Sequence, residues 1–377
     1  MTIPLGLYIH VPFCKERCDF CAFYLELHRE PAAEGFLRSL AVELRLHAAQ
    51  QTIAGRTFQS VYFGGGTPTA LRTSQLLLIL DEVRRSFSLA TDCEITVEAH
   101  PGTVTRADLS ALFATGVNRI SFGAESLNDD ELARIGRPGA ASETTASIRW
   151  ARDAGFTNIN LDLIYGLPGQ TLERWHDTLR RCIALGPTHL SCYALTVEEG
   201  TRYARDIRSS RTQAPDEAVQ VDMFRKTGPI LAEAGYEQYE ISNYAVPGFA
   251  CRHNLLYWTN GDYLGVGPSA QSFVQGVRFG TIPNLTCYQR ELAQGRFPIQ
   301  ERVPLSKEEH LRDAVIFGLR LLRGIPSSWV RQHAVNFGHL DTLQTLHAER
   351  FIEEDGTATR LSAEGRLYAD TIAERLY

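Results

Sequence analysis

Three cysteines near the amino terminus of the 377-residue chain are close enough to act together. Cys14, Cys18 and Cys21 fall within eight positions, and no fourth cysteine is nearby. Thiolate is the usual ligand of iron–sulfur clusters, and three thiolates leave one iron of a [4Fe-4S] cubane open for a chelating ligand. A zinc site completed by His10 or His28 is the alternative, but zinc modules usually pair two separated knuckles. The spacing therefore favours a cluster with an open iron.

Further polar or glycine-rich positions interrupt apolar segments. Glu98 and Asp162 stand among aliphatic and β-branched residues, where a carboxylate is costly unless it is paired or hydrogen-bonded. Arg119, Arg137 or a cationic ligand with hydroxyl groups are candidate partners. Glycines 64–66 lack side chains, so a ligand can lie against bare backbone amides there, and a plain turn is the alternative.

A repeated strand-then-helix pattern would position these residues. Short apolar or aromatic runs predict six strands, at 7–11, 60–63, 94–99, 118–123, 158–165 and 189–195. Helical spacing lies between them, at 35–47, 73–87, 105–114, 142–154 and 171–185. Such alternation requires a parallel sheet with right-handed crossovers. We therefore predict an α/β fold, a partial (β/α)6 barrel, whose candidate site residues meet at the carboxyl ends of the strands.

The composition excludes several classes of protein. With 38 Lys and Arg against 44 Asp and Glu, the formal charge is −6, which disfavours binding to nucleic-acid phosphates. No apolar run approaches the roughly 18 residues of a membrane span. The first residues lack the basic segment and cleavage site of a secretory signal. We expect a cytoplasmic location with reduced thiols, in which isolated cysteines fill the core: Cys93, Cys182, Cys192 and Cys287.

The cysteine loop after a first barrel strand resembles the radical S-adenosylmethionine (SAM) superfamily. The resemblance extends to a branch that holds oxygen-independent coproporphyrinogen dehydrogenases and HemW haem chaperones. It rests on motifs along essentially the whole chain: YIHVPFC from Tyr8, YFGGGTPT from Tyr62, EITVEAHP from Glu94, RISFGAES from Arg119, GRP from Gly136, DLIYGLPGQT from Asp162 and YEISNYA from Tyr239. It implies that the open iron chelates the amino and carboxylate groups of SAM.

The resemblance also implies roles for single residues. Tyr8, Gly65 and Glu98 match positions that contact the cluster-bound SAM. The positions that match the lining of a second SAM site are Phe20, Gly66, Thr67, Glu125, Arg137, Asp162 and Ala194. At one of them the chain departs from the pattern, because Glu125 stands where relatives usually carry glutamine. A second departure is Gln271, which stands where the family usually shows histidine.

Three features favour the chaperone branch over the dehydrogenases. Phe23 occupies the place of a fourth cysteine that the dehydrogenases share. Only 13 residues precede Cys14, whereas the dehydrogenases resemble one another in a longer segment there. The segment from Cys251 resembles the HNxxYW element associated with haem binding. It would make His253 an axial ligand of haem iron and place Tyr257 and Trp258 against the macrocycle. The alternative is a loop histidine bonded to the backbone, with the two aromatic rings packed in the core.

We expect three regions: residues 1–200 as the barrel with the cluster loop, 201–300 as a barrel-closing and haem-binding region, and 301–377 as a small, mostly helical carboxyl-terminal domain. Helices are expected at 216–235, 308–322, 340–347 and 362–376, an extended segment at 236–244 and a loop-rich stretch at 243–273. The carboxyl-terminal helix order would also suit a DNA-binding winged helix, which the acidic balance disfavours.

The sequence thus predicts a [4Fe-4S], SAM-binding haem chaperone of the HemW type. Its partners would be haem, acceptor haemoproteins and an electron donor. If the chain is instead an enzyme, the resemblance implies an oxygen-independent coproporphyrinogen III oxidase, an oxidoreductase of porphyrin biosynthesis whose ligand is a porphyrinogen. A related radical methyltransferase that uses two SAM molecules is a further alternative.

Overall fold

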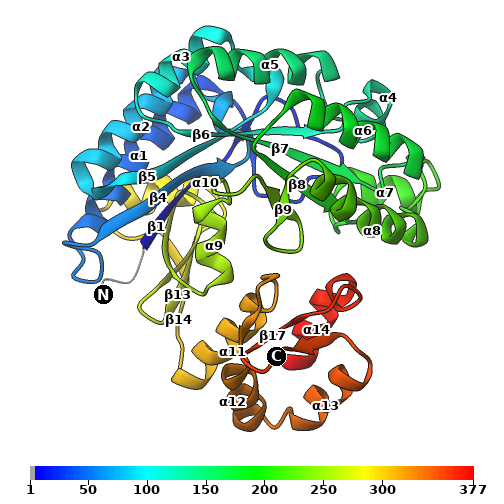
Figure 1. Ribbon diagram of the computed structural model, residues 1–377. Helices are drawn as coiled ribbons and strands as arrows, with labels where there is room; N and C mark the ends of the chain where they lie inside the picture. Colours follow the sequence, from blue (N-terminus) through cyan, green and yellow to red (C-terminus); the bar gives the residue numbers. More distant parts are fainter. Residues whose placement is uncertain (1–4) are drawn as a thin grey trace.

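The computed structural model describes residues 5–377, and its centre is a curved parallel sheet (Figure 1). Residues 1–4 lie outside the described residues. They belong to the amino-terminal segment in which the sequence predicts no secretory signal. The predicted six parallel strands are all present, which confirms the partial barrel, and a seventh, β11, pairs parallel with β1 at the edge. In sheet order the parallel strands are β11 (Asp262–Val266), β1 (Leu5–Val11), β4 (Thr57–Gly65), β5 (Ser88–Ala99), β6 (Arg119–Glu125), β7 (Asn158–Tyr165) and β8 (His189–Ala194).

Helices connect the parallel strands and cover the outer face of the sheet (Figure 1). The helix expected at 35–47 begins five residues earlier, at Glu30, and the other four helices expected between the strands begin and end within one residue of the observed bounds. The helices of the barrel region are α1 (Glu30–Ala48), α2 (Thr73–Ser86), α3 (Arg106–Ala114), α4 (Asp129–Arg134), α5 (Ala141–Ala154), α6 (Leu172–Leu185), α7 (Arg202–Arg208) and α8 (Glu217–Glu233). No helix within residues 5–377 combines the length and the apolar character that crossing a bilayer requires.

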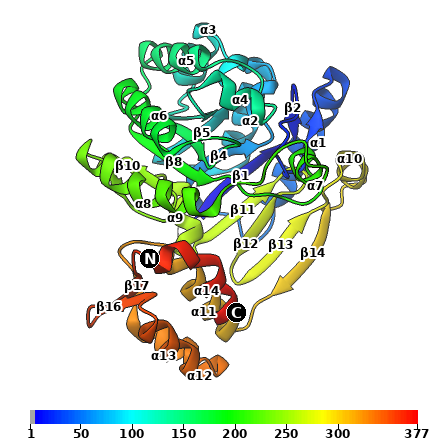
Figure 2. The ribbon, with the colours of Figure 1, turned by 90° about the vertical axis from the view of Figure 1, so that its right-hand side faces the viewer.

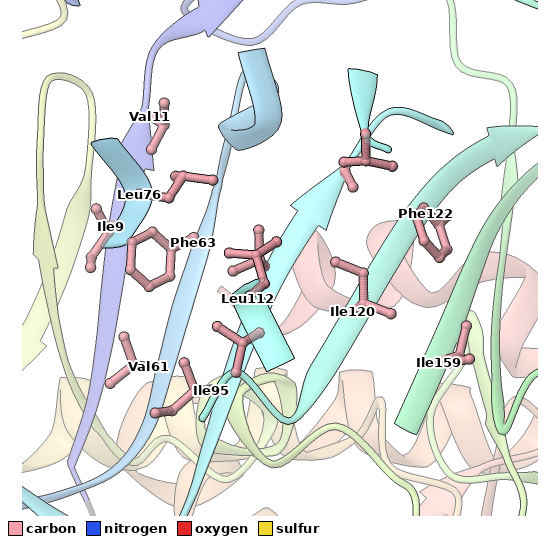
Figure 3. Close-up of a cluster of buried hydrophobic side chains, with 14 of the residues drawn as sticks. Ile9, Val11, Val61, Phe63, Leu76, Ile95, Leu112, Ile120, Phe122 and Ile159 are labelled. Atoms are coloured by element: carbon pink, nitrogen blue, oxygen red, sulfur yellow. The ribbon is translucent and has the colours of Figure 1, made fainter. Parts of the chain in front are cut away.

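Strand residues alternate between an apolar outer face and a polar inner face. Figure 3 shows part of the resulting core, where buried side chains of β1, β4, β5, β6 and β7 lie near Leu76 of α2 and Leu112 of α3. Since side chains of a strand point alternately to its two faces, the residues between these apolar ones face the barrel interior. The inner positions carry Tyr62, Glu98, Arg119, Ser121, Asn160 and Asp162, all of which line one cavity except Ser121.

Antiparallel strands extend the sheet at both edges. Beyond β11 lie β12 (Gln271–Val274), β13 (Val277–Thr281) and β14 (Ile299–Pro304), which lead toward the carboxyl-terminal domain (Figure 2). Beyond β8 lie β10 (Asn243–Ala245) and β9 (Glu237–Gln238). The stretch 243–273, expected to be loop-rich, also holds the short helix α9 (Arg252–Trp258), and α10 (Leu285–Ala293) follows it.

The carboxyl-terminal elements pack around a second, smaller core, which Ile241 of the preceding region joins, and they are not all helical. Its buried side chains include Val315, Val330 and Leu346. A three-stranded antiparallel sheet accompanies the expected helices, together with a helix that the sequence pattern did not indicate, α12. The carboxyl-terminal elements are α11 (Lys307–Gly318), β15 (Ile325–Pro326), α12 (Ser327–Phe337), α13 (Leu340–Ala348), β16 (Ile352–Glu354), β17 (Ala358–Leu361) and α14 (Ala369–Leu376).

Candidate functional site

A cavity of about 790 Å³ lies inside the barrel, on the polar face of the sheet. This volume is within the range of roughly 300–1,000 Å³ typical of small-molecule sites. The residues that the sequence predicts as ligands of the cluster, SAM and haem all line it: Tyr8, Cys14, Cys18, Phe20, Cys21, Gly65, Gly66, Thr67, Glu98, Glu125, Arg137, Asp162, Ala194 and His253. The fold therefore brings together residues that are up to 245 positions apart in the chain.

The cysteine loop leaves the carboxyl end of β1 and continues through the short strands β2 (Phe13–Cys14) and β3 (Glu26–Leu27). The three cysteines are free thiols. The Cys14 Sγ lies 3.4 Å from the Thr67 hydroxyl, and Arg137 Nη1 donates to the Cys18 Sγ at 3.4 Å. Burial raises the pKa of Cys14, Cys18 and Cys21, and the nearby guanidinium of Arg137 opposes this.

The donor set fits an iron–sulfur cluster. Soft thiolates that carry hydrogen bonds from neighbouring groups are the usual ligands of such clusters. Within residues 5–377 no three His, Cys, Asp or Glu side chains converge on one point in the way that a single metal ion requires. A cubane joins each thiolate to a different iron atom, so its ligands need not converge.

The glycine-rich segment at the end of β4 holds the cysteine loop in place, rather than offering free amides to a ligand. The Gly66 and Thr67 amides donate to the Val11 and Phe13 carbonyls, at 2.9 and 2.7 Å, so they are not free for a ligand. A Cβ on Gly66 would lie 2.7 Å from the Phe13 carbonyl oxygen. Glycine is required here because the cysteine loop passes directly against this backbone.

Glu98 and Asp162 find their partners in neutral groups. The Tyr62 hydroxyl donates to Glu98 Oε1 at 2.7 Å, and Ser121 and Asn160 each donate to Asp162 at 2.9 Å. Burial, together with the negative charge of Asp162, raises the pKa of Glu98 to about 8, against the hydrogen bond from Tyr62. Of the candidate partners, neither Arg119 nor Arg137 forms an ion pair with these two carboxylates in the described part of the chain.

Arg137 instead connects the cluster loop to the end of β6. Its Nη2 donates to the Gly123 carbonyl at 2.6 Å and pairs with Glu125 Oε1 at 3.0 Å, while Nη1 reaches Cys18. Glu125 has φ 58°, a left-handed conformation that costs energy for a residue with a side chain. It stands where the register between β6 and β7 shifts. The ion pair holds the Glu125 side chain at the cavity wall.

His253 lies at the end of the cavity away from the cysteine loop, on helix α9. The Ser60 hydroxyl lies 2.8 Å from its Nδ1, and the Tyr257 hydroxyl lies 2.9 Å from its Nε2. Its ring stacks on that of Tyr62, with centroids 5.2 Å apart. Burial, together with the positive charge of Arg119, lowers the pKa of His253 to about 3, so the imidazole is neutral.

Glu94 of β5 fixes helix α9 under the barrel. Its carboxylate accepts the backbone N–H groups of Arg252 and His253, both at 3.2 Å, and the Cys251 thiol at 3.5 Å. A carboxylate at a helix amino terminus satisfies free N–H groups and interacts favourably with the helix dipole. The sequence analysis did not identify Glu94 as a site residue. Its position four residues before Glu98, on the same strand face, was the available signal.

Two residues that the sequence analysis discussed lie away from the cavity. The Arg320 guanidinium carbon lies 4.7 Å from the centroid of the Trp258 ring, so Trp258 packs toward the carboxyl-terminal domain. It therefore does not face the space where a macrocycle was expected. Gln271 is exposed at the start of β12 and does not line the cavity, so its replacement of histidine leaves the lining unchanged.

Comparisons with known proteins show which family the chain belongs to. Residues 8–182 match the Radical SAM superfamily. Heme chaperone HemW of Mycobacterium tuberculosis (strain ATCC 25618 / H37Rv) is 32% identical over 376 residues, 99% of this chain and 95% of that protein. Heme chaperone HemW of Escherichia coli (strain K12) is 38% identical over 303 residues, 79% of this chain and 78% of that protein. The solved structure of coproporphyrinogen III oxidase (HemN) from Escherichia coli, a radical SAM enzyme, superposes with a TM-score of 0.86 at 28% identity, covering 100% of this chain and 90% of that chain.

A partial parallel barrel that carries a three-cysteine loop after its first strand is the architecture of a radical SAM protein. Identity above 30% over nearly the full length of a HemW protein identifies the family within that superfamily. Within the radical SAM superfamily, the chain belongs to the HemW family.

Proposed function

We propose that the chain is a haem chaperone that binds a [4Fe-4S] cluster, SAM and haem and passes haem to acceptor haemoproteins. The single observation that supports this most directly is that one cavity is lined both by the three thiols and by His253. The name of a relative that matches over nearly its full length agrees with it. We further propose that the protein acts in the cytoplasm and takes electrons from a separate donor.

In this proposal, Cys14, Cys18 and Cys21 hold the cluster, which supplies an open iron to bind SAM and an electron to the site. Tyr8, Gly65 and Glu98 line the cavity and would contact the cluster-bound SAM. A second SAM would contact residues that include the Arg137–Glu125 ion pair: Phe20, Gly66, Thr67, Glu125, Arg137, Asp162 and Ala194.

His253 would ligate the haem iron through a ring nitrogen. Both nitrogens already have hydrogen-bond partners, so iron at Nε2 would have to displace the Tyr257 hydroxyl. The lowered pKa favours ligation, because a neutral imidazole keeps a lone pair for the metal. The aromatic rings of Tyr8 and Tyr62, which stack near His253, offer apolar surface to a flat ligand.

A porphyrinogen oxidase is the second candidate, and the structural likeness to HemN over the whole chain favours it. The two functions separate when purified protein with a reconstituted cluster is incubated without oxygen with coproporphyrinogen III, SAM and reductant. The chaperone predicts no decarboxylated product and stable haem uptake. Formation of the decarboxylated porphyrinogen would overturn it in favour of the oxidase.

Haem uptake, followed by its Soret absorbance, tests the role of His253. His253→Ala should lose stable uptake, whereas Tyr257→Phe, which frees Nε2, should bind haem several-fold more tightly, since a hydrogen bond contributes about 1 kcal/mol. His47→Ala is a matched control, because His47 is also buried but does not line the cavity. Equal uptake by His253→Ala and His47→Ala would contradict the assignment.

A further inference from the structure

Arg119, a buried arginine in the cavity wall, lacks partners for part of its guanidinium. It is the first residue of β6, lines the cavity and is only 1% exposed. Within the part of the chain that the structure describes, its Nε and Nη1 have no hydrogen-bond partner. Leaving charged N–H groups buried and unpaired costs free energy, so a ligand that supplies an acceptor would offset that cost.

The strand register places Arg119 at the level of the cavity that also holds His253. Arg119 pairs with Thr96 of β5, which in turn pairs with Tyr62 of β4. The Tyr62 ring stacks on His253. Positions nearer the cysteine loop are those that follow along the strands, such as Glu98 and Ser121, which are paired with each other. Arg119 is therefore closer to the histidine end than to the open mouth of the barrel.

The protein's own carboxylates do not occupy Arg119. Glu94 accepts hydrogen bonds from the start of α9, Glu98 accepts from Tyr62, and Asp162 accepts from Ser121 and Asn160. A buried guanidinium N–H group without a partner favours a charged oxygen acceptor, and a carboxylate supplies one. No carboxylate within residues 5–377 forms an ion pair with Arg119, so an anionic oxygen group from outside the chain would supply the acceptor that its N–H groups lack.

We propose that Arg119 binds a propionate carboxylate of the tetrapyrrole whose iron His253 ligates. This inference rests on the proposed haem-binding function and adds to it a residue that selects for the carboxylate side chains of the macrocycle. SAM also carries a carboxylate, and the experiment below separates the two sources.

The experiment is a thermodynamic cycle between ligand and protein, using the full chain with its reconstituted cluster. Ferric haem and haem dimethyl ester, in which both propionates are neutral, are titrated against wild type, Arg119→Gln, Arg119→Lys and Arg312→Gln. Arg312 is a matched control, because it is also buried but lies on α11 and does not line the cavity. The affinity for SAM is measured in parallel by equilibrium dialysis.

Wild type and Arg312→Gln should bind the diester about 10- to 100-fold more weakly than haem, as expected for loss of a charged hydrogen-bonded pair. Arg119→Gln should bind both ligands equally, and Arg119→Lys should regain part of the preference for haem. Affinity for SAM should stay within about threefold in every variant.

Equal binding of haem and its diester by wild type would overturn the inference and leave the chaperone function intact, and this comparison needs no variant to fold. A haem preference retained in Arg119→Gln would also overturn it, as would a loss confined to SAM binding. Wild type that binds neither porphyrin would overturn both this inference and the proposed function.

Discussion

Buried polar side chains in the cavity differ in how well the protein itself satisfies them. His253 and Asp162 have hydrogen-bond partners on both polar atoms. Arg119 keeps unpaired N–H groups, and Glu98 has its pKa raised to about 8. A site in which some groups are satisfied and others are not is less stable empty than loaded. The unpaired N–H groups of Arg119 are where a ligand contact is expected.

Glu98 should make the stability of the ligand-free chain depend on pH. Its pKa is about 8 in the folded state and near its ordinary value of 4.5 in the unfolded state. Between these values the folded chain holds a proton that the unfolded chain releases, so this contribution to stability is present below about pH 4.5 and is lost as the pH rises to 8. The stability of Glu98→Gln relative to wild type should therefore increase progressively from pH 5 to 8, by about 1.4 kcal/mol for each pH unit.

Urea denaturation of the cluster-free chain at pH 5, 6.5 and 8 measures this gain. Glu233→Gln, at an exposed position of α8, controls for the change from acid to amide. A difference between Glu98→Gln and wild type that does not change with pH would show that Glu98 is already ionised at pH 5.

Much of the residue set could be read from the sequence, but little of its bonding could. Glu98 and Asp162 were recognisable because a carboxylate interrupts an apolar strand. The pairing of Glu125 with Arg137 was not, since it depends on the left-handed turn at the end of β6 and on the loop that returns Arg137 to it. Likewise the amides after Gly65 were expected to be free, and the close passage of the cysteine loop uses them.

At the scale of elements, the long βα units were predictable and the short elements were not. Six strands with strong apolar runs and the helices between them appear where the pattern placed them. Helix α9 and strand β11 contain only seven and five residues, too few for a periodic signal. Tertiary contacts define them instead, because Glu94 receives the first turn of α9 and β1 pairs with β11.

Helix α9 should depend on Glu94. Glu94→Ala would leave the backbone N–H groups of Arg252 and His253, the second of them buried, without an acceptor, and we expect the free energy of unfolding to fall by about 2–4 kcal/mol. Glu94→Gln keeps one acceptor oxygen and should lose less. Chemical denaturation gives both values, and haem titration should show weaker binding in the order wild type, Gln, Ala. Similar stability of Glu94→Ala and wild type would mean that α9 is held by its apolar contacts alone.

At the scale of the whole molecule, the carboxyl-terminal domain packs against the region that carries α9. Arg320 lies over the Trp258 ring and near Glu240, while Arg225 pairs with Glu364 at 2.8 Å. Figure 1 shows α9 between the sheet and this domain. The composition indicated an appended domain, but which surface of the barrel it covers follows from these particular side-chain contacts and has no signal in the sequence.

A double-mutant cycle tests this contact between the domains. Arg320→Gln and Trp258→Leu should each lower the free energy of unfolding, and the double variant should lose less than the sum. We expect a coupling energy of about 0.5–2 kcal/mol, the range of cation–π pairs. Additive losses, measured by denaturation of the full chain, would show that the stacked pair contributes nothing to joining the two regions.

Strand β5 connects the two ends of the cavity. Glu94 and Glu98 are four positions apart, about 13 Å along an extended strand. One anchors the helix that presents the histidine, and the other lies beside the segment against which the cysteine loop runs. A sliding or tilting of this single strand would move Glu94 and Glu98 together, so a change of shape at the His253 end of the cavity would also reach the end beside the cysteine loop.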